Sequence, residues 1–304
     1  MSSGHASGEK ILLGLIGSGI QRSLSPALHE EEGRQHGVRL HYQLIDLDLS
    51  DQGPQALPTL LQAAKVMGYA GLNITYPCKQ AVIALLDELS EEAALMGAVN
   101  TVVIRDGRCV GHNTDGVGWA SGFARALPQA DLSRVVLLGA GGAGAAVAHA
   151  ALRLGVENLQ VFDRDTGKME ALAADLQRVY GMTRVTANAD VRPGLQRATG
   201  LIHATPTGMD KKPGLPLDAD LLHPGLWVSE IVYFPLETAL LKVARARGCA
   251  VSDGGGMAVG QAVGAFERFT GLKADPLRME SHFRRMVSQL GERVQRSPLS
   301  EASV

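Results

Sequence analysis

The amino-acid sequence predicts an α/β protein built from two successive α/β units. Short runs of β-branched and apolar residues alternate with longer stretches of helical period along most of the 304 residues. An extended segment with a tight-turn signal interrupts this alternation near residue 106, and a second alternating pattern begins near residue 135. A chain of this length also has enough material for two domains of ordinary size.

In the first unit, each expected strand is followed by an expected helix. The strands are expected at 11–16, 41–47 and 71–75, and the helices at 26–36, 57–67 and from about residue 79 onward. This order predicts a parallel sheet with helices on its faces.

The middle of the chain reads as a β-hairpin. Residues 100–105 and 108–112 are extended segments joined by Asp106-Gly107, a dipeptide typical of two-residue hairpin turns. A helix is expected from about 115 to about 125, because a Leu-Pro pair follows it and disfavours its continuation.

The second unit returns to regular alternation. Strands are expected at 135–138, 159–162, 184–187, 200–204, 227–232 and 250–252, and helices from the turn after the first strand to 154, at 167–179 and at 236–246. Two terminal helices, 257–270 and 276–290, are expected to pack on either unit. The boundary between the units is expected near residues 116–119.

Composition excludes several classes of function. The chain is 45% hydrophobic and 20% charged, with a formal net charge of −2 and only 4% aromatic residues, so we expect no nucleic-acid partner. It has no run of 18 apolar residues and no apolar leader, so no membrane span is expected. Three sparse cysteines indicate reduced thiols in a cytoplasmic protein, without a disulfide framework or metal-ligand spacing.

The second unit opens with a glycine-rich turn. A short apolar strand is followed by Gly139-Ala140-Gly141-Gly142-Ala143-Gly144 and then directly by a helix, which is the context that confirms a dinucleotide-binding motif. Gly139 allows the tight turn, Gly141 lets the backbone approach a pyrophosphate, and Gly144 lets helix and strand pack closely. Free N–H groups at the helix start favour phosphate binding. We therefore expect a doubly wound, Rossmann-type cofactor domain.

An acidic cluster after the next strand bears on the choice of cofactor. Asp163 lies about 20 residues after Gly144, where a carboxylate binds the adenosine ribose hydroxyls and repels the 2′-phosphate of NADP. Asp165 adds a second negative charge or is simply part of a solvated strand end. Arg164 complicates this choice, because an arginine here could pair with such a phosphate or could equally stack on the adenine face. We expect NAD, with NADP less favoured.

Polar side chains gather at predicted strand ends of the first unit. The segment Asn73–Lys79 lies at the C-terminal end of a strand, where open α/β sheets bind ligands. Asn100 and residues 112–115 flank the hairpin. Ser23 and Ser25 precede a helix, and their hydroxyls either cap that helix or bind a ligand carboxylate. Together these groups suggest a site for a polyol acid.

These motifs resemble the shikimate dehydrogenase family over residues 10–290. The matching strings, in chain order, are Ser23-Leu24-Ser25-Pro26, Asn73-Ile74-Thr75-Tyr76-Pro77-Cys78-Lys79, Gly97-Ala98-Val99-Asn100-Thr101, Gly111-His112-Asn113-Thr114-Asp115-Gly116, the glycine turn, Ala204-Thr205-Pro206 and Gln261. In this order they are highly specific. The resemblance implies reversible oxidation of a cyclic polyol acid, such as shikimate, to its 3-keto form.

The resemblance also implies roles for individual residues. Lys79 and Asp115 would be the catalytic pair, because the substrate hydroxyl needs a proton acceptor when hydride leaves and the ketone needs a donor in reverse. An adjacent carboxylate favours the charged ammonium, so Asp115 is expected to orient Lys79, bind the hydroxyl and relay protons. Ser23, Ser25 and Tyr233 would bind the substrate carboxylate, Asn73, Thr75, Asn100 and Gln261 the ring hydroxyls, and Thr205, Pro206, Val232 and Gly256 would lie near the cofactor.

Several positions depart from the pattern usual in the biosynthetic enzymes of this family. The departures are Cys78 for His, His203 for Asn, Glu230 for Asp, Gly260 for His, and Asp163-Arg164-Asp165 for an Asn-Arg-Thr type of turn. The Asp163 pattern resembles the NAD-using quinate/shikimate branch, whereas Ser25 is typical of shikimate enzymes. We expect shikimate as the substrate, with quinate and aminoshikimate as alternatives.

The resemblance implies a substrate-binding, catalytic domain of residues 10–116 and 254–290 and a cofactor domain of residues 117–253. Residues 1–9 and 292–304 are expected to be flexible tails. A non-catalytic NAD-binding regulator on the same fold is the competing hypothesis, but retention of both Lys79 and Asp115 argues against it. The sequence is compatible with a monomer or a homodimer.

Overall fold

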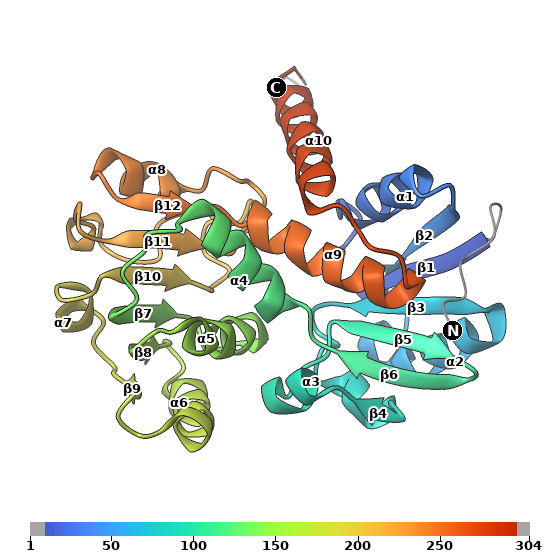
Figure 1. Cartoon of the computed structure of the whole chain (residues 1–304), viewed down its shortest axis with the longest axis horizontal. Coiled ribbons are helices and arrows are strands. Elements are labelled where there is room, and N and C mark those ends of the chain that lie inside the picture. The colour runs from blue at the N-terminus through green and yellow to red at the C-terminus, as the bar shows by residue number, and fades with distance from the viewer. Residues whose placement is uncertain (1–9, 297–304) are drawn as a thin grey trace, which may run out of the picture.

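The protein contains two six-stranded sheets that lie side by side, with helices α4 and α9 between them (Figure 1). This computed structural model describes residues 10–296. The expected tail at 1–9, and residues 297–304 of the other, lie outside the described residues. Residues 292–296, which were expected to belong to that tail, instead continue the last helix, which ends at Arg296.

The N-terminal sheet has the strand order β2-β1-β3-β5-β6-β4. Its strands are β1 (Lys10–Gly17), β2 (Arg39–Asp46), β3 (Tyr69–Ile74), β4 (Glu88–Leu89), β5 (Thr101–Arg105) and β6 (Arg108–His112). Strands β2, β1 and β3 are parallel, as expected, but β5 runs antiparallel to both β3 and β6. The sheet is therefore mixed, because the hairpin adds to the edge of the parallel part.

The hairpin turn has the geometry that its sequence predicts. Arg105 pairs with Arg108, which leaves Asp106 and Gly107 as a two-residue loop with φ values of 50° and 74°. Positive φ at both central residues is the requirement of a type I′ turn, which suits the right-handed twist of the flanking strands.

The C-terminal sheet is parallel throughout, in the order β12-β11-β10-β7-β8-β9. Its strands are β7 (Arg134–Leu138), β8 (Asn158–Phe162), β9 (Val185–Ala187), β10 (Gly200–His203), β11 (Trp227–Glu230) and β12 (Ala250–Ser252). This order corresponds to the doubly wound Rossmann arrangement, confirming the expected fold class. The strand order reverses between β7 and β10, so the ligand crevice of such a sheet lies at their carboxyl ends.

The helices cover the faces of the two sheets. They are α1 (Ser25–Gln35), α2 (Leu57–Met67), α3 (Glu91–Met96), α4 (Asp115–Ala126), α5 (Gly142–Leu154), α6 (Thr166–Tyr180), α7 (Arg192–Leu195), α8 (Ala239–Ala246), α9 (Gly255–Thr270) and α10 (Pro276–Arg296). The terminal helices pack on the N-terminal unit: Phe269 of α9 lies against β1 and β5, and Phe283 of α10 lies in a cluster with Leu28 of α1.

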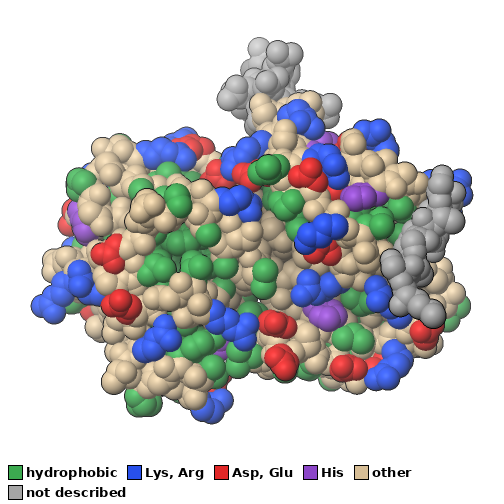
Figure 2. All heavy atoms as spheres, viewed as in Figure 1, with side chains coloured by type: hydrophobic (Ala, Val, Ile, Leu, Met, Phe, Trp, Pro, Cys, Tyr) green, Lys and Arg blue, Asp and Glu red, His purple; other side chains and the backbone are tan. Residues whose placement is uncertain are grey.

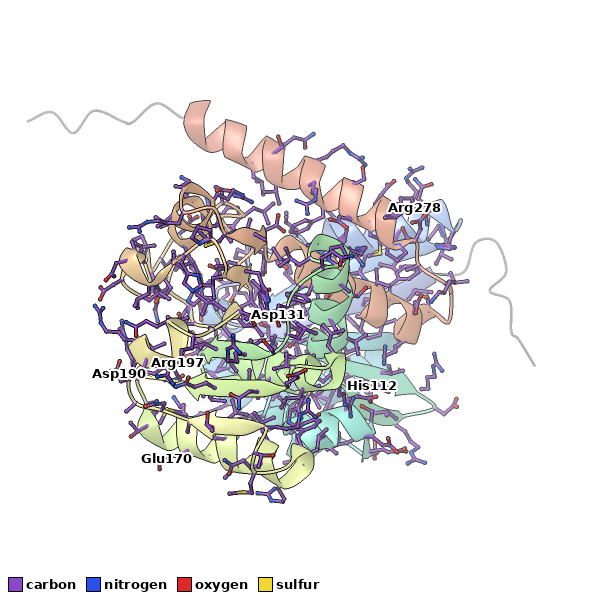
Figure 3. The ribbon with its side chains drawn as sticks, turned by 60° about the vertical axis from the view of Figure 1, so that its left-hand side comes forward. His112, Asp131, Glu170, Asp190, Arg197 and Arg278 are labelled. Carbon is purple, nitrogen blue, oxygen red and sulfur yellow. The ribbon has the colours of Figure 1, made fainter. Side chains whose placement is uncertain are left out.

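Helix α10 is also fixed to α1 by a buried carboxylate. Glu32 of α1, only 1% exposed, accepts hydrogen bonds from Arg278 Nε (2.9 Å) and from the Asp275 amide (2.9 Å). Figure 3 shows Arg278 on the first turn of α10, beside α1. Elsewhere charge is dispersed, since Figure 2 shows both signs interspersed on the face in view.

Helices α4 and α9 cross at glycines. A Cβ added to Gly118 would lie 2.9 Å from the carbonyl carbon of Gly260, and one added to Gly122 would lie 2.6 Å from the carbonyl carbon of Gly256. The two backbones are therefore in direct contact. Close packing explains Gly260, one of the positions where the sequence departs from its family pattern.

Some expected elements were wrong in extent or missing. The helix expected from about residue 79 is a 3-10 turn at Ala81–Leu85, and the short elements β4, α3 and α7 were not predicted. Helix α9 begins at Gly255, two residues earlier than expected, because its glycines are needed at the crossing with α4. In the described part of the chain, no helix is both long and apolar enough to cross a bilayer.

Candidate active site

The centre of the site is an ion pair between the turn after β3 and the start of α4. Lys79 Nζ lies 2.6 Å from Oδ2 of Asp115, the first residue of α4. The side chains are 23% and 8% exposed, so the pair is largely shielded but not sealed from solvent. The structure thus brings together two residues that are 36 positions apart in the sequence.

Asn100 fixes the other side of the Asp115 carboxylate. Its Nδ2 donates to Asp115 Oδ1 (2.8 Å) and to Thr114 Oγ1 (2.9 Å), and its Oδ1 accepts from the Thr114 amide (2.8 Å) and from Thr101 Oγ1 (2.9 Å). Both oxygens of Asp115 are therefore bound, one by Lys79 and one by Asn100. Both amide hydrogens of Asn100 bond within the protein, one of them to Asp115, so this residue orients the carboxylate.

A second amide lies behind the first. Asn73 Nδ2 donates to the Asn100 carbonyl and to Thr101 Oγ1, both at 3.1 Å, and its Oδ1 accepts from the Tyr42 hydroxyl at 2.7 Å. Only acceptor capacity on Oδ1 remains for a ligand. Burial raises the pKa of Tyr42 well above its usual value, while a hydrogen bond with Ser25 acts in the opposite sense. A hydrogen-bonded chain therefore runs from Tyr42 through Asn73 to the Asn100 carbonyl.

Sequence reasoning missed Tyr42, whose hydroxyl donates to the side chain of Asn73. Its signal was weak. Buried and exposed residues alternate along β2, and a tyrosine at one of its buried positions is not in itself a sign of function. Only the pairing of β2, β1 and β3 places Asn73 within reach of its hydroxyl.

Ser23 and Ser25 lie at the start of α1, and Ser25 is its first residue. Its N-cap residue is Leu24, which makes no side-chain cap bond, and the Ser23 hydroxyl donates to Ser25 Oγ at 3.1 Å. Ser23 Oγ also accepts from the Ser25 amide at 3.2 Å. Neither hydroxyl makes an N-cap bond, although Ser23 Oγ binds the first amide of the helix. Both side chains are only partly buried.

The C-terminal unit reaches this site through the segment after β11. Tyr233 is 42% exposed, yet loss of solvent around its hydroxyl and the nearby Asp115 carboxylate both raise its pKa. The guanidinium of Arg22 lies 5.5 Å from the ring of Phe234 and 3.7 Å from Asp210. The loops of the two units therefore meet at Arg22.

Two further candidates for binding the ring hydroxyls, Thr75 and Gln261, make hydrogen bonds to nearby backbone carbonyls. Thr75 is half-buried, and its amide donates to the Ile16 carbonyl at 2.9 Å. Gln261 is on α9, beside Gly118 of α4, and its Nε2 donates to the Ala258 carbonyl at 3.1 Å.

The glycine turn lies at the carboxyl end of β7. Gly139 has φ 107°, and a Cβ on it would lie 2.6 Å from the Ala204 carbonyl oxygen, so a turn residue with a side chain would be excluded. Gly144 packs against the Gly139 carbonyl. In contrast, no atom of the described residues lies within 4 Å of a Cβ placed on Gly141 or Gly142. The turn is therefore tightly packed at Gly139 and Gly144 and open at Gly141 and Gly142. Ala140 and Ala143 lie between these two pairs in the sequence.

The acidic cluster is held against this turn. Asp163 Oδ2 accepts from the Ala140 amide at 2.7 Å, and Oδ1 accepts from the Asp165 amide at 2.9 Å. Asp165 is the N-cap of α6, where it accepts from the Lys168 amide at 3.1 Å. Arg164 is exposed. Asp165 thus has a structural role, while Asp163 is fixed beside the open face of the turn.

The remaining cofactor candidates surround the carboxyl ends of β10 and β11. Thr205 follows β10 and is half-buried, Pro206 is exposed, and the Val232 amide donates to Glu230 Oε1 at 3.0 Å. Gly256 is buried in the crossing with α4, which by itself explains the glycine.

Comparison with known proteins agrees with this geometry. Residues 15–102 match the family model described as the shikimate dehydrogenase substrate binding domain. A protein of Streptomyces avermitilis named shikimate dehydrogenase (NADP(+)) is 58% identical over 273 residues, covering 89% of this chain and 94% of the relative. A quinate/shikimate dehydrogenase (NAD(+)) of Corynebacterium efficiens is 48% identical over 278 residues, covering 90% and 98%.

Solved structures give the same result. Quinate dehydrogenase from Corynebacterium glutamicum, determined in complex with NAD, has a TM-score of 0.87 and 47% identity, covering 91% of this chain and 99% of that one. A shikimate 5-dehydrogenase from Listeria monocytogenes, in complex with shikimate and NAD, has a TM-score of 0.80 and 30% identity, covering 90% and 96%. The chain therefore belongs to the shikimate dehydrogenase family.

Proposed function

We propose that this protein catalyses the reversible, NAD-dependent oxidation of shikimate to 3-dehydroshikimate. The observation that carries the proposal is the Lys79–Asp115 pair, which is partly exposed, braced by Asn100 and adjacent to Tyr233 of the cofactor-binding unit. A proton-transfer pair at the meeting point of a polyol site and a dinucleotide fold suits an alcohol dehydrogenase.

The residues divide the work by their chemistry. Ser23, Ser25 and Tyr233 present hydroxyl donors for the substrate carboxylate, and Thr75, Gln261 and Asn73 present polar groups for the ring hydroxyls. Lys79 takes the proton of the reacting hydroxyl during oxidation and returns it during reduction. Asp115 holds Lys79 in place and passes the proton onward, while Asn100 keeps the Asp115 carboxylate from rotating.

The second unit fits a nicotinamide dinucleotide, which when bound accepts or supplies the hydride. Gly141 and Gly142 leave open space beside the first turn of α5, and that helix has no side-chain cap, so its N–H groups are available to a pyrophosphate. Thr205, Pro206 and Val232 border the same end of the sheet. We propose Gly256 as a neighbour of the nicotinamide through its backbone only.

We propose NAD as the preferred form. Asp163 is fixed by the Ala140 and Asp165 amides at the end of β8, where its charge opposes a 2′-phosphate. Exposed Arg164 acts in the opposite direction, so NADP remains a weaker alternative. The relatives carry both cofactors in their names.

The division of labour follows from this proposal. Residues 10–116 and 254–290 would bind the polyol acid and 117–253 the cofactor. We also propose a cytoplasmic enzyme, supported by three buried cysteines that are all free thiols. A monomer and a homodimer are both compatible with it.

The test is steady-state kinetics with shikimate and quinate, each with NAD and NADP, followed by Lys79→Ala. We expect shikimate with NAD to give the highest kcat/KM and Lys79→Ala to lower kcat by roughly 10³-fold, with NADH binding retained. Lys65→Ala is a matched control, because Lys65 is also 23% exposed and also faces a carboxylate, Asp87, at 3.7 Å. Equal kcat in the Lys79 variant and the wild type would contradict the proposal. A higher kcat/KM for quinate would move the assignment to the quinate alternative.

A further inference from the structure

A hydrogen-bonded chain of three side chains, two of them completely buried, crosses from β11 to the end of β10. Glu230 and His203 end these two neighbouring strands, and their side chains are completely buried. His203 Nδ1 lies 2.8 Å from Glu230 Oε1, and its Nε2 lies 2.5 Å from Thr205 Oγ1. These are two of the positions at which the sequence departs from the usual family pattern.

The hydrogen bonds around Glu230 define the direction of this chain. Its Oε1 also accepts from the Val232 amide (3.0 Å), and its Oε2 accepts from the Thr238 hydroxyl (3.0 Å). A carboxylate with these partners acts only as an acceptor, so Nδ1 of His203 is the N–H donor. With the ring taken as neutral, Nε2 is then an acceptor and the Thr205 hydroxyl donates to it.

Thr205 therefore turns its oxygen lone pairs away from His203. The Thr207 amide lies near one of them, at 3.3 Å. The other remains for a group beside the half-buried side chain. Thr205 directly adjoins the glycine turn, since a Cβ on Gly139 would lie 3.1 Å from the Thr205 amide nitrogen. This is the end of β7 and β10, where the strand order reverses and dinucleotides bind.

We propose that His203, oriented by Glu230, is a positioning residue that holds the Thr205 hydroxyl as a hydrogen-bond acceptor for a donor group of the dinucleotide, either a ribose hydroxyl or the carboxamide. The inference rests on the proposed function, because it requires a dinucleotide at this end of the sheet. An asparagine at position 203 reaches the carboxylate but has no atom at the place of Nε2. The histidine thus adds a contact that the usual residue lacks.

The test is direct binding of NADH to the full-length protein in the absence of any polyol acid. Binding is measured through the fluorescence of NADH. Thr205→Val and His203→Asn are each expected to raise the Kd about tenfold, the equivalent of one hydrogen bond, while Thr205→Ser restores it to within about twofold. The double variant is expected to bind no more weakly than Thr205→Val, because His203 acts through Thr205. The KM for shikimate is expected to stay unchanged.

Tyr180→Phe is the matched control, since it breaks another bond between a buried histidine and a hydroxyl in the same unit, His149 Nδ1 to Tyr180 Oη at 3.1 Å. It is expected to keep the wild-type Kd. The inference would be overturned if Thr205→Val bound NADH with the wild-type Kd. It would also be overturned if the increase in Kd of the double variant were the product of the two single increases. If His203→Asn lowered the melting temperature but left the Kd for NADH unchanged, the role of His203 would be structural alone, and the inference would again be overturned. Failure of the wild type to bind either NADH or NADPH would instead overturn the proposed function.

Discussion

His29 couples the stability of the N-terminal unit to pH. Its ring is fully buried, stacks on Tyr42 at 4.9 Å, and has no hydrogen-bond partner for either nitrogen within the described residues. Burial lowers its pKa from 6.5 to about 3, although Glu32 acts in the opposite direction. The folded protein thus keeps the ring neutral while an unfolded chain would protonate it.

The magnitude follows from proton linkage. Since the folded pKa lies below the unfolded one, the titration of this group has no effect well above pH 6.5 and lowers the free energy of unfolding as pH falls from 6.5 toward about 3. The slope approaches about 1.4 kcal/mol per pH unit, and the loss at about pH 5 is roughly 2 kcal/mol. His29→Phe removes both the titration and the two unpaired nitrogens.

The assay is urea unfolding of the wild type and His29→Phe at about pH 7.5 and pH 5. Between about pH 7.5 and pH 5, we expect the free energy of unfolding of the wild type to fall by roughly 2 kcal/mol more than that of His29→Phe. His29→Gln is the control, because it cannot titrate but stays polar. It should show the same change relative to the wild type between the two pH values, and it should be less stable than His29→Phe at both. A stability difference between the wild type and His29→Phe that is independent of pH would refute the reasoning.

Three further predictions concern the site and its frame. Asp163→Asn should raise kcat/KM for NADP relative to NAD by about tenfold, since it removes a charge that repels the 2′-phosphate; an unchanged ratio would assign the preference elsewhere. Asn100→Ala frees Oδ1 of Asp115 and should lower kcat by about 10²-fold with a smaller change in KM for shikimate, and it should cost about 2 kcal/mol in urea unfolding. Arg278→Leu leaves Glu32 buried without its main partner and should cost about 3 kcal/mol at neutral pH. Burial opposes ionisation of Glu32, but hydrogen bonds from Arg278 and the Asp275 amide outweigh it and lower its pKa. The stabilisation that ionised Glu32 contributes is therefore complete above pH 4.5 and is lost as pH falls through the folded pKa. The melting temperatures of the wild type and Arg278→Leu should consequently converge in acid.

Local signals in the sequence predicted the parts of the fold that depend on neighbours in the chain. The strand, glycine turn and helix from Arg134 to Leu154 and the Asp106-Gly107 hairpin were found because each is specified within a few residues. Helix α3 was missed although Ser90 caps it and Gly97 ends it in a left-handed conformation, because six residues are too short for a periodic pattern.

What the sequence could not show depends on strand pairing. The link from Tyr42 to Asn73 requires β2, β1 and β3 side by side, and the link from His203 to Glu230 requires the register of β10 and β11. The early start of α9 has a similar origin, since glycines at 255 and 256 disfavour a helix locally. In each case a tertiary contact overrides or completes the local preference.

The glycine crossing of α4 and α9 sets the spacing between the two binding surfaces. One helix carries Asp115 at its start and leads into the C-terminal sheet, and the other returns from that sheet and packs on the first. The separation of the two halves is thus defined by absent side chains at Gly118, Gly122, Gly256 and Gly260. A methyl group added at any of these positions would clash with the backbone of the facing helix and push the two helices apart.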